Sequence, residues 1–174
     1  ANQEMIRDNN RRLVLEYIVN NPPVSRADLS KQLKLTKATI SAIVQDLLAQ
    51  NLILEIGSAK TSLGRKPILL EFNQQYGYAL AIDVRPRQIL TLISDLKGEN
   101  CHVQEYPFPP EVQLLPLLSR IIQETLEQYE QKTRKVLGIS IGIYGVVQKN
   151  QVLFTPYYPL PHPDLGRVLE AEFL

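Results

Sequence analysis

The chain has 174 residues, of which 44% are hydrophobic and 21% are charged, and its formal net charge at pH 7 is +1. This composition is typical of a globular chain that is long enough for two small domains. A net charge so close to zero excludes a broadly basic protein that coats nucleic acid, and the single cysteine, Cys101, excludes an internal disulfide.

No apolar stretch reaches the length of a membrane span and no signal peptide opens the chain, so we expect a cytoplasmic protein without membrane contacts. Only His102 and His162 accompany Cys101 as nitrogen or sulfur metal ligands, so we expect no zinc site and no other metal or cofactor in this chain. Cys101 and His102 are expected to lie on a strand as ordinary packing residues.

The N-terminal region begins with two predicted helices. The first covers roughly residues 3–20, and the segment Asn21-Pro22-Pro23 ends it because proline lacks the N–H that a helix needs. Ser25 followed three residues later by Asp28 indicates a capping box at the start of the second helix. We expect the buried side of this helix to hold Ala27, Leu29 and Leu33.

A third helix is predicted after a turn at Lys34 and Leu35, with Thr36 as its cap and apolar residues at helical spacing over residues 37–50. The opposite face carries short or hydrogen-bonding side chains, which would let the helix axis approach base edges in a major groove. Gln45 suits adenine, and Lys37 suits guanine or a phosphate. The alternative is an ordinary solvated helix face. The face comprises Lys37, Ala38, Thr39, Ser41, Ala42 and Gln45.

Two strand-like runs, 52–56 and 68–72, are joined by a loop that carries three cations and no acidic residue. Gly64 in this loop gives the backbone freedom to bring Arg65 close to a narrow minor groove. Helix, turn, helix and hairpin form the pattern of a winged helix-turn-helix, so duplex DNA is the first partner to consider. A flexible surface turn is the alternative interpretation of the loop. The predicted DNA-binding residues are Arg26, Thr36, Lys37, Ala38, Thr39, Ser41 and Gln45 in the helices and Lys60, Arg65 and Lys66 in the loop.

The charges divide unevenly along the chain. Residues 1–75 hold ten Lys plus Arg against seven Asp plus Glu, which gives +3, while residues 76–174 hold nine against eleven, which gives −2. Any affinity for DNA must therefore come from a local patch, and in a dimer from two such patches. We predict a DNA-binding domain over 1–75 and a second domain over 76–174, with Asn73-Gln74-Gln75 as the hinge.

The second half changes to strands. Three consecutive strands with short connections predict an antiparallel meander, a helix follows it, and the next strand is expected to be buried because it consists of β-branched residues and small glycines. The predicted strands cover 78–84, 88–96, 102–108, 136–143 and 151–155, and the predicted helices cover 111–132 and the segment from 164 to 174.

This order resembles the first subdomain of the actin-like, ribonuclease-H-like sugar kinases. Together with the N-terminal winged helix, it resembles the ROK family of transcriptional repressors. The resemblance is carried by the segments 64–67, 81–84, 95–98 and 138–147. It implies an α/β multi-domain chain in which the first part of a ROK domain, with the order βββαβ, follows the winged helix. It further implies a homodimer on an operator with an inverted repeat, released by a sugar, for which the xylose repressors of the family suggest a pentose such as xylose.

The chain departs from the kinase pattern after Asp83. Where a ROK kinase has glycines and a threonine, this chain has Val84-Arg85-Pro86-Arg87, in which the proline has no N–H for a phosphate. We therefore expect no ATP binding and no enzyme activity, with Arg85 and Arg87 as surface residues at a hairpin tip. Tyr144 replaces a proline of the kinase pattern. Tyr144 and Gly145 are thus candidate effector-binding residues, although a packed tyrosine is the alternative.

The family resemblance also implies segments that this sequence lacks. The chain stops within the helix that begins near Asp164, before the catalytic aspartate segment, the zinc cluster and the second subdomain, so we interpret it as an N-terminal fragment. Two other functions stay open at this point. One is a sugar kinase with an appended DNA-binding head, and the other is a protein-interaction module, because winged helices also bind proteins.

Overall fold

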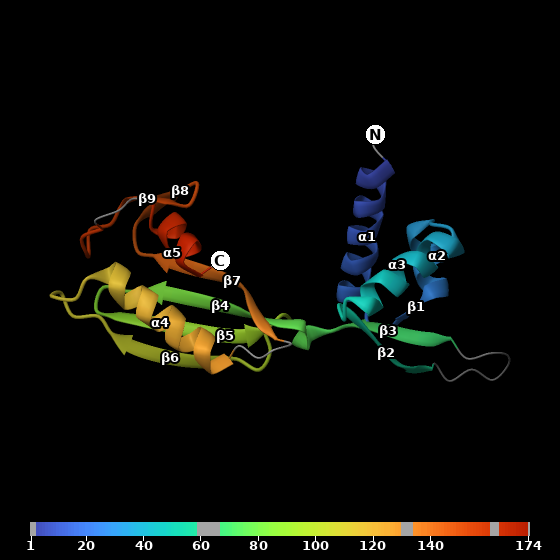
Figure 1. The fold of residues 1–174 in the computed structure, drawn as a ribbon, viewed down its shortest axis with the longest axis horizontal. Helices are drawn as coiled ribbons and strands as arrows, with labels where there is room; N and C mark the ends of the chain where they lie inside the picture. The colour runs from blue at the N-terminus through green and yellow to red at the C-terminus, as the bar shows by residue number, and fades with distance from the viewer. Residues whose placement is uncertain (1–2, 59–66, 130–133, 161–163, 174) are drawn as a thin grey trace. The chain divides into compact units, whose positions relative to one another are not determined.

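The computed structural model describes residues 3–58, 67–129, 134–160 and 164–173. These residues form two compact units, 1–73 and 74–174, which Figure 1 shows as ribbons. The units join between Asn73 and Gln74, inside the segment where the sequence suggested a hinge. In the described part of the chain, no helix combines the length and the apolar character that a membrane span requires.

Unit 1 contains three helices and a small antiparallel sheet. Its elements are α1 (Gln3–Asn20), β1 (Val24–Ser25), α2 (Arg26–Leu33), α3 (Lys37–Ala49), β2 (Ile53–Ser58) and β3 (Ile68–Phe72). The strands lie in the order β1-β3-β2, and β2 and β3 form the hairpin of the wing. The predicted winged helix-turn-helix is confirmed. Strand β1 was not predicted, because two residues are too short to show an alternating pattern.

A capping box begins α2, as the sequence predicted. The backbone N–H of Asp28 donates to Ser25 Oγ at 3.2 Å, and the Ser25 hydroxyl and backbone N–H both donate to Asp28 Oδ2, at 2.7 and 3.0 Å. The hydroxyl of Ser25 is the main reason that the pKa of Asp28 is lowered. The start of α2 is therefore held by hydrogen bonds that favour an ionised carboxylate.

The turn between α2 and α3 is held in a specific conformation. Lys34 lies in the left-handed region at φ 54°, where it caps the C-terminus of α2. The Ser30 hydroxyl donates to the carbonyl of Leu35 at 2.7 Å, and Thr36 then caps the N-terminus of α3. This short, hydrogen-bonded turn fixes the direction of α3 relative to α2.

The core of unit 1 lies where the three helices meet the sheet. Its buried hydrophobic residues are Val14, Ile18, Val24, Leu29, Ile40, Ile43, Val44, Leu47, Ile53 and Leu70. Leu29 belongs to the core as predicted, and Leu33 packs against it. The prediction for Ala27 was wrong, because this residue is exposed. Two residues along an α-helix is a rotation of about 200°, so Ala27 and Leu29 point to opposite sides.

Unit 2 is built on a four-stranded mixed sheet. Its elements are η1 (Gln74–Tyr76), β4 (Gly77–Val84), β5 (Gln88–Asp95), β6 (His102–Pro107), α4 (Leu114–Tyr129), β7 (Lys135–Ile143), β8 (Val146–Gln148), β9 (Gln151–Phe154) and α5 (Leu165–Phe173). The strand order is β6-β5-β4-β7, with β8 and β9 as a separate hairpin. The meander of β4, β5 and β6 is antiparallel as predicted, and β7 pairs with β4 in parallel.

Both helices of unit 2 share one core with the sheet (Figure 1). The buried residues of this core come from β4, β5 and β7, from both helices and from the segments beside them. They are Leu80, Ile82, Val84, Ile89, Ile93, Phe108, Leu114, Leu117, Leu118, Ile121, Ile122, Val136, Tyr158, Leu165 and Leu169. The core therefore fixes the positions of the strand ends at which the candidate effector residues lie.

Two expectations for unit 2 were wrong. Strand β7 is not a buried strand, because only Val136 in it is buried; β7 ends the sheet order, so β4 is its one paired neighbour in the described part of the chain. Cys101 does not pack on a strand. It is exposed, it precedes β6, and its Sγ lies 3.2 Å from the carbonyl oxygen of Gly98 in the turn. His102 does lie on a strand as expected, because it begins β6, and its ring centroid lies 5.8 Å from that of Tyr129, although the residue is exposed.

Candidate nucleic-acid interface

One face of α3 is free of packing. Ile40, Ile43, Val44 and Leu47 turn inward, and the residues on the opposite side of the helix are exposed. The exposed set includes five of the residues that the sequence proposed for base contacts: Lys37, Ala38, Ser41, Ala42 and Gln45. Their short or unbranched side chains leave the helix surface open to close approach by a base-pair edge.

Thr36 and Thr39 are engaged with each other. The backbone N–H of Thr39 donates to Thr36 Oγ1 at 3.1 Å, and the two hydroxyl oxygens lie 2.8 Å apart. Thr39 is half-buried, whereas Thr36 is exposed. These two predicted DNA-binding residues therefore already hold the first turn of α3, and a contact with DNA would be additional to that role.

The segment around the turn carries only positive charge. Residues 29–45 include Lys31, Lys34 and Lys37 and no Asp or Glu. All three lysines are exposed, and none forms an ion pair with another residue that the structure describes. The predicted DNA-binding residues did not include Lys31 and Lys34, although the absence of acidic residues over this stretch is visible in the sequence.

Arg26 lies at a different place from the α3 face. Its Nη2 donates to Glu55 Oε1 at 3.1 Å, which links the start of α2 to strand β2. The two side chains are 34% and 40% exposed, so the pair is accessible to solvent. Arg26 thus has a partner within the protein. The remaining predicted residues, Lys60, Arg65 and Lys66, lie outside the described residues.

In unit 2, the candidate effector residues follow the end of β7. Tyr144 is 45% exposed, and its ring meets that of Tyr157 edge-to-face at a centroid distance of 6.3 Å. A Cβ atom on Gly145 would lie only 2.1 Å from the carbonyl oxygen of Phe154. Tyr144 is therefore only partly packed, and Gly145, directly before β8, lies so close to the end of β9 that a side chain has no room there.

Asp83 and Arg85 lie at the end of β4 that is next to the end of β7. Arg85 Nε donates to Asp83 Oδ2 at 2.7 Å, and this hydrogen bond raises the pKa of the guanidinium. Asp83 on β4 pairs in register with Gly142 on β7. Gly142 lies two residues before Tyr144. The carboxyl ends of the parallel strands β4 and β7 therefore lie side by side. Ligands of α/β sheets commonly bind at such strand ends. Arg87 is exposed, as expected.

Tyr158 holds the segment that carries Tyr157 against the end of β4. Its hydroxyl donates to the carbonyl of Val84 at 3.1 Å, and its ring packs edge-to-face on Phe108 with centroids 5.5 Å apart. Burial is the main reason that the pKa of Tyr158 is raised. The neutral phenol therefore anchors the aromatic pair beside β4.

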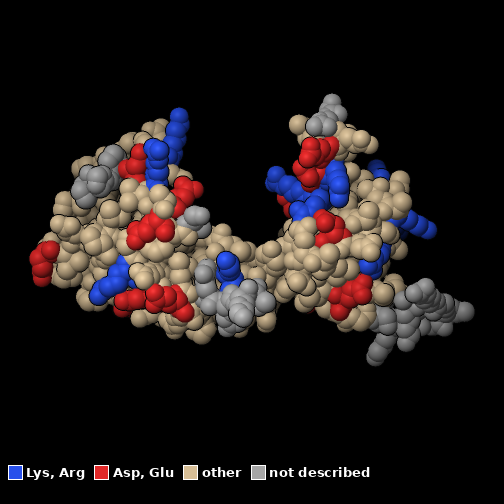
Figure 2. Space-filling view, viewed as in Figure 1, with Lys and Arg blue, Asp and Glu red and all other residues tan. Residues whose placement is uncertain are grey.

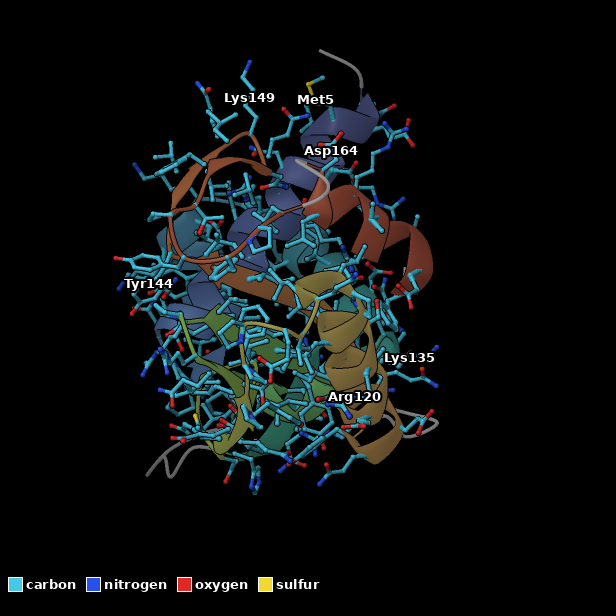
Figure 3. All side chains as sticks on the ribbon, turned by 90° about the vertical axis from the view of Figure 1, so that its left-hand side faces the viewer. Met5, Arg120, Lys135, Tyr144, Lys149 and Asp164 are labelled. Carbon is cyan, nitrogen blue, oxygen red and sulfur yellow. The ribbon has the colours of Figure 1, made fainter. Side chains whose placement is uncertain are left out.

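A cavity of unit 2 is separate from these residues. A cavity of about 640 Å³ lies between β7, the β8–β9 hairpin and α5, and its polar lining includes Ser140, Lys149, Asp164 and Arg167. Figure 3 shows Lys149 and Asp164 apart from Tyr144, which points outward at another side of the unit. Tyr144 and Gly145 do not line this cavity. The sequence contained no signal that distinguished the two places.

Comparisons with known proteins agree with this division. Residues 9–59 match the model of the MarR family, and residues 79–173 match the model of the ROK family. The chain is 33% identical over 179 residues to the xylose repressor of Bacillus subtilis strain 168, covering 99% of this chain and 46% of that protein. It is 23% identical to the N-acetylglucosamine repressor of Escherichia coli O6:H1, covering 99% of this chain and 44% of that protein.

A solved structure matches as well. The crystal structure of a ROK family transcriptional regulator, described as a homolog of the E. coli MLC protein, superposes with a TM-score of 0.75 at 25% identity. The match covers 96% of this chain and 43% of that one. The chain thus spans slightly less than half the length of these relatives.

Proposed function

The chain belongs to the ROK family, and on that basis we propose that it is the DNA-binding and first sensing part of a sequence-specific transcriptional repressor. The single observation that carries the proposal is the α3 face with Lys37, Ala38, Ser41, Ala42 and Gln45 exposed beside an acid-free turn. Such a face can enter a major groove and present hydrogen-bonding and methyl groups to base edges.

The proposed partner is an operator with an inverted repeat, bound by two copies of the chain. A single local patch offers few phosphate contacts, whereas a pair of recognition helices spaced along one face of the duplex doubles the contacts and reads a symmetric sequence. Lys60, Arg65 and Lys66 of the wing are proposed to contact phosphates or the neighbouring minor groove.

The proposed effector is a sugar that binds unit 2, with a pentose such as xylose as the first candidate because several relatives carry the name xylose repressor. Tyr144 and Gly145 are the proposed contacts, beside the Asp83–Arg85 pair at the same strand ends. Sugar binding would release DNA if it favoured an arrangement in which both recognition helices cannot reach their half-sites.

The geometry at Asp83 supports a sensing role over a kinase role. A sugar kinase would need backbone amides and flexible glycines after this aspartate to hold the nucleotide phosphates. Here the carboxylate instead accepts a hydrogen bond from Arg85, and Pro86 has no amide to donate. The relatives named above are regulators of transcription, in agreement with this interpretation.

The test is selection from a random duplex library with the 174-residue chain, followed by anisotropy titration of the selected duplex and a scrambled duplex at several salt concentrations. Enrichment of an inverted repeat, with log K falling linearly with log salt, is the expected result. Failure to enrich any sequence, together with binding that does not depend on salt, would overturn the proposal and favour a protein partner.

A further inference from the structure

The two helices α1 and α3 enclose a groove that the sequence could not show. A cavity of about 260 Å³ lies between Ile6, Arg7 and Asn10 of α1 and Thr39, Ala42 and Asp46 of α3, together with their neighbours. Ala42 also belongs to the exposed face of α3 that we propose for base contacts. The N-terminal half of α1 therefore borders the proposed DNA-reading surface directly.

This half of α1 is not part of the core. The buried residues of α1 are Val14 and Ile18, both near its C-terminus, while Ile6 is 51% exposed. Figure 1 shows α1 beside α3, with its first turns reaching beyond the rest of the unit. The first turns of α1 are thus free to contact something outside unit 1.

The arginines of α1 differ in their partners. Arg11 donates to Asp46 at 2.9 Å, and Arg12 donates to Glu16 at 2.9 Å. Arg7 is exposed and forms no ion pair with any other residue in the described ranges. Figure 2 shows basic side chains over α1 with acidic side chains directly beside them. Of the three guanidinium groups, that of Arg7 is therefore the one without an ion-pair partner in the described ranges.

The acidic residues of α1 do not line the groove. Glu4 and Asp8 are absent from its lining, while Gln3, Ile6, Arg7 and Asn10 belong to it. Of the charged residues Glu4, Arg7 and Asp8, only Arg7 therefore lines the groove that faces α3.

The geometry points to Arg7 as a phosphate-contacting residue that flanks the recognition helix and fixes its position in the major groove. This inference rests on the proposed function, because it requires α3 to lie in the groove of a DNA duplex. An element beside a helix in the major groove meets the phosphates that border the groove, and arginine binds a phosphate through two parallel N–H groups. The contact would position α3 without reading sequence.

The test compares Arg7→Gln with Arg12→Gln, which removes the same charge from the same helix but takes it from an arginine already paired with Glu16. Each variant of the 174-residue chain is titrated by anisotropy against the selected inverted repeat and a scrambled duplex, between 50 and 300 mM salt. Arg7→Gln is expected to reduce the steepness of log K against log salt by about 0.9 per bound chain. Affinity at 0.1 M salt should fall about eightfold on both duplexes, with Arg7→Lys restoring most of it.

Three outcomes overturn the inference. If the wild-type chain binds with a steep salt slope and Arg7→Gln leaves that slope unchanged, Arg7 has no phosphate contact and the proposed function stands. If Arg12→Gln reduces the slope as much as Arg7→Gln, the lost net charge of the chain explains the effect, and the location of Arg7 beside α3 does not. If the wild-type chain shows no salt-dependent DNA binding, the proposed function fails first and this inference fails with it.

Discussion

Arg11 of α1 donates from Nε to Asp46 Oδ2 of α3 at 2.9 Å, which joins residues that are 35 positions apart in the sequence. The side-chain amide of Gln50 donates to the other oxygen of the same carboxylate at 3.0 Å. Both members of the ion pair are about one-third exposed, so water screens their attraction in part. This contact ties α1 to the outer flank of the recognition helix, outside the hydrophobic core.

We predict a modest coupling energy for this pair. A double-mutant cycle with Arg11→Met and Asp46→Asn, measured by urea unfolding, should give a coupling of about 0.2–1 kcal/mol at low salt. The coupling should shrink when salt is raised, because the pair is partly exposed. Arg12→Met with Glu16→Gln is the matched cycle within one helix. Zero coupling between Arg11 and Asp46 would mean that the core alone holds α1 in place.

Gln45→Ala should change which sequence the chain prefers. Gln45 is exposed on α3, and its amide can pair with adenine, so its loss should cost about 1–3 kcal/mol of discrimination at the base pair that it faces. The salt slope should stay the same, because no phosphate contact is removed. Gln32→Ala, at an exposed position of α2, is the control. Equal losses on selected and scrambled duplexes would contradict a base contact by Gln45.

Thr36→Ala should act mainly on stability. Thr36 Oγ1 accepts the backbone N–H of Thr39, and loss of such an N-cap typically costs about 1 kcal/mol. Ser41→Ala, within the same helix, is expected to change stability by less than about 0.5 kcal/mol. Urea unfolding of both variants checks this difference. If Thr36→Ala unfolds like the wild type, the hydroxyl serves another purpose, for which a DNA contact is the first candidate.

The sequence predicted the elements that depend on local signals. Helix α1 has the predicted range, and the caps at Ser25 and Thr36 begin α2 and α3 where expected, because hydrogen bonds between near neighbours determine such caps. The meander was predictable for the same reason. Its strands alternate with short turns, and in one turn the Asp95 carboxylate accepts two backbone N–H groups within four residues.

Features that depend on distant pairing were not predictable. The contact of Arg26 with Glu55 joins residues 29 positions apart. No pattern in the sequence around either residue indicates that the two side chains meet. The exposure of β7 follows from the strand order, which no pattern within residues 136–143 reveals. The groove between α1 and α3 depends on how the two helices pack against each other, which the sequence alone does not show. The sequence therefore could not single out Arg7.

Gly145→Ala should destabilise unit 2. The added Cβ would meet the carbonyl oxygen of Phe154 at 2.1 Å, so the backbone of the β8–β9 hairpin must move, at a cost of about 1–3 kcal/mol. Gly138→Ala on β7 is the matched control, because its Cβ would meet nothing within 4 Å. The free energies of unfolding from urea titrations followed by circular dichroism compare the two variants. Equal stabilities would show that the approach of Phe154 does not require a glycine at position 145.

Asp95 should make stability depend on pH. Burial of its carboxyl group would raise the pKa, but hydrogen bonds from the Asn100 side chain and the backbone N–H groups of Glu99 and Lys97 outweigh burial and lower it. A lowered pKa in the folded state means that the ionised carboxylate stabilises the fold above the unfolded pKa of about 3.9. This stabilisation is lost as pH falls through the folded value.

Asp95→Asn removes the titrating group and so tests this linkage. The wild type should exceed the variant in stability by the largest margin near pH 7, and the margin should narrow as pH falls below about 4. Urea unfolding between pH 3 and 7 measures the margin directly, with Glu111→Gln, at an exposed position, as the control for loss of a carboxylate. A margin that stays constant over this range would mean that the Asp95 hydrogen bonds do not favour its charged form.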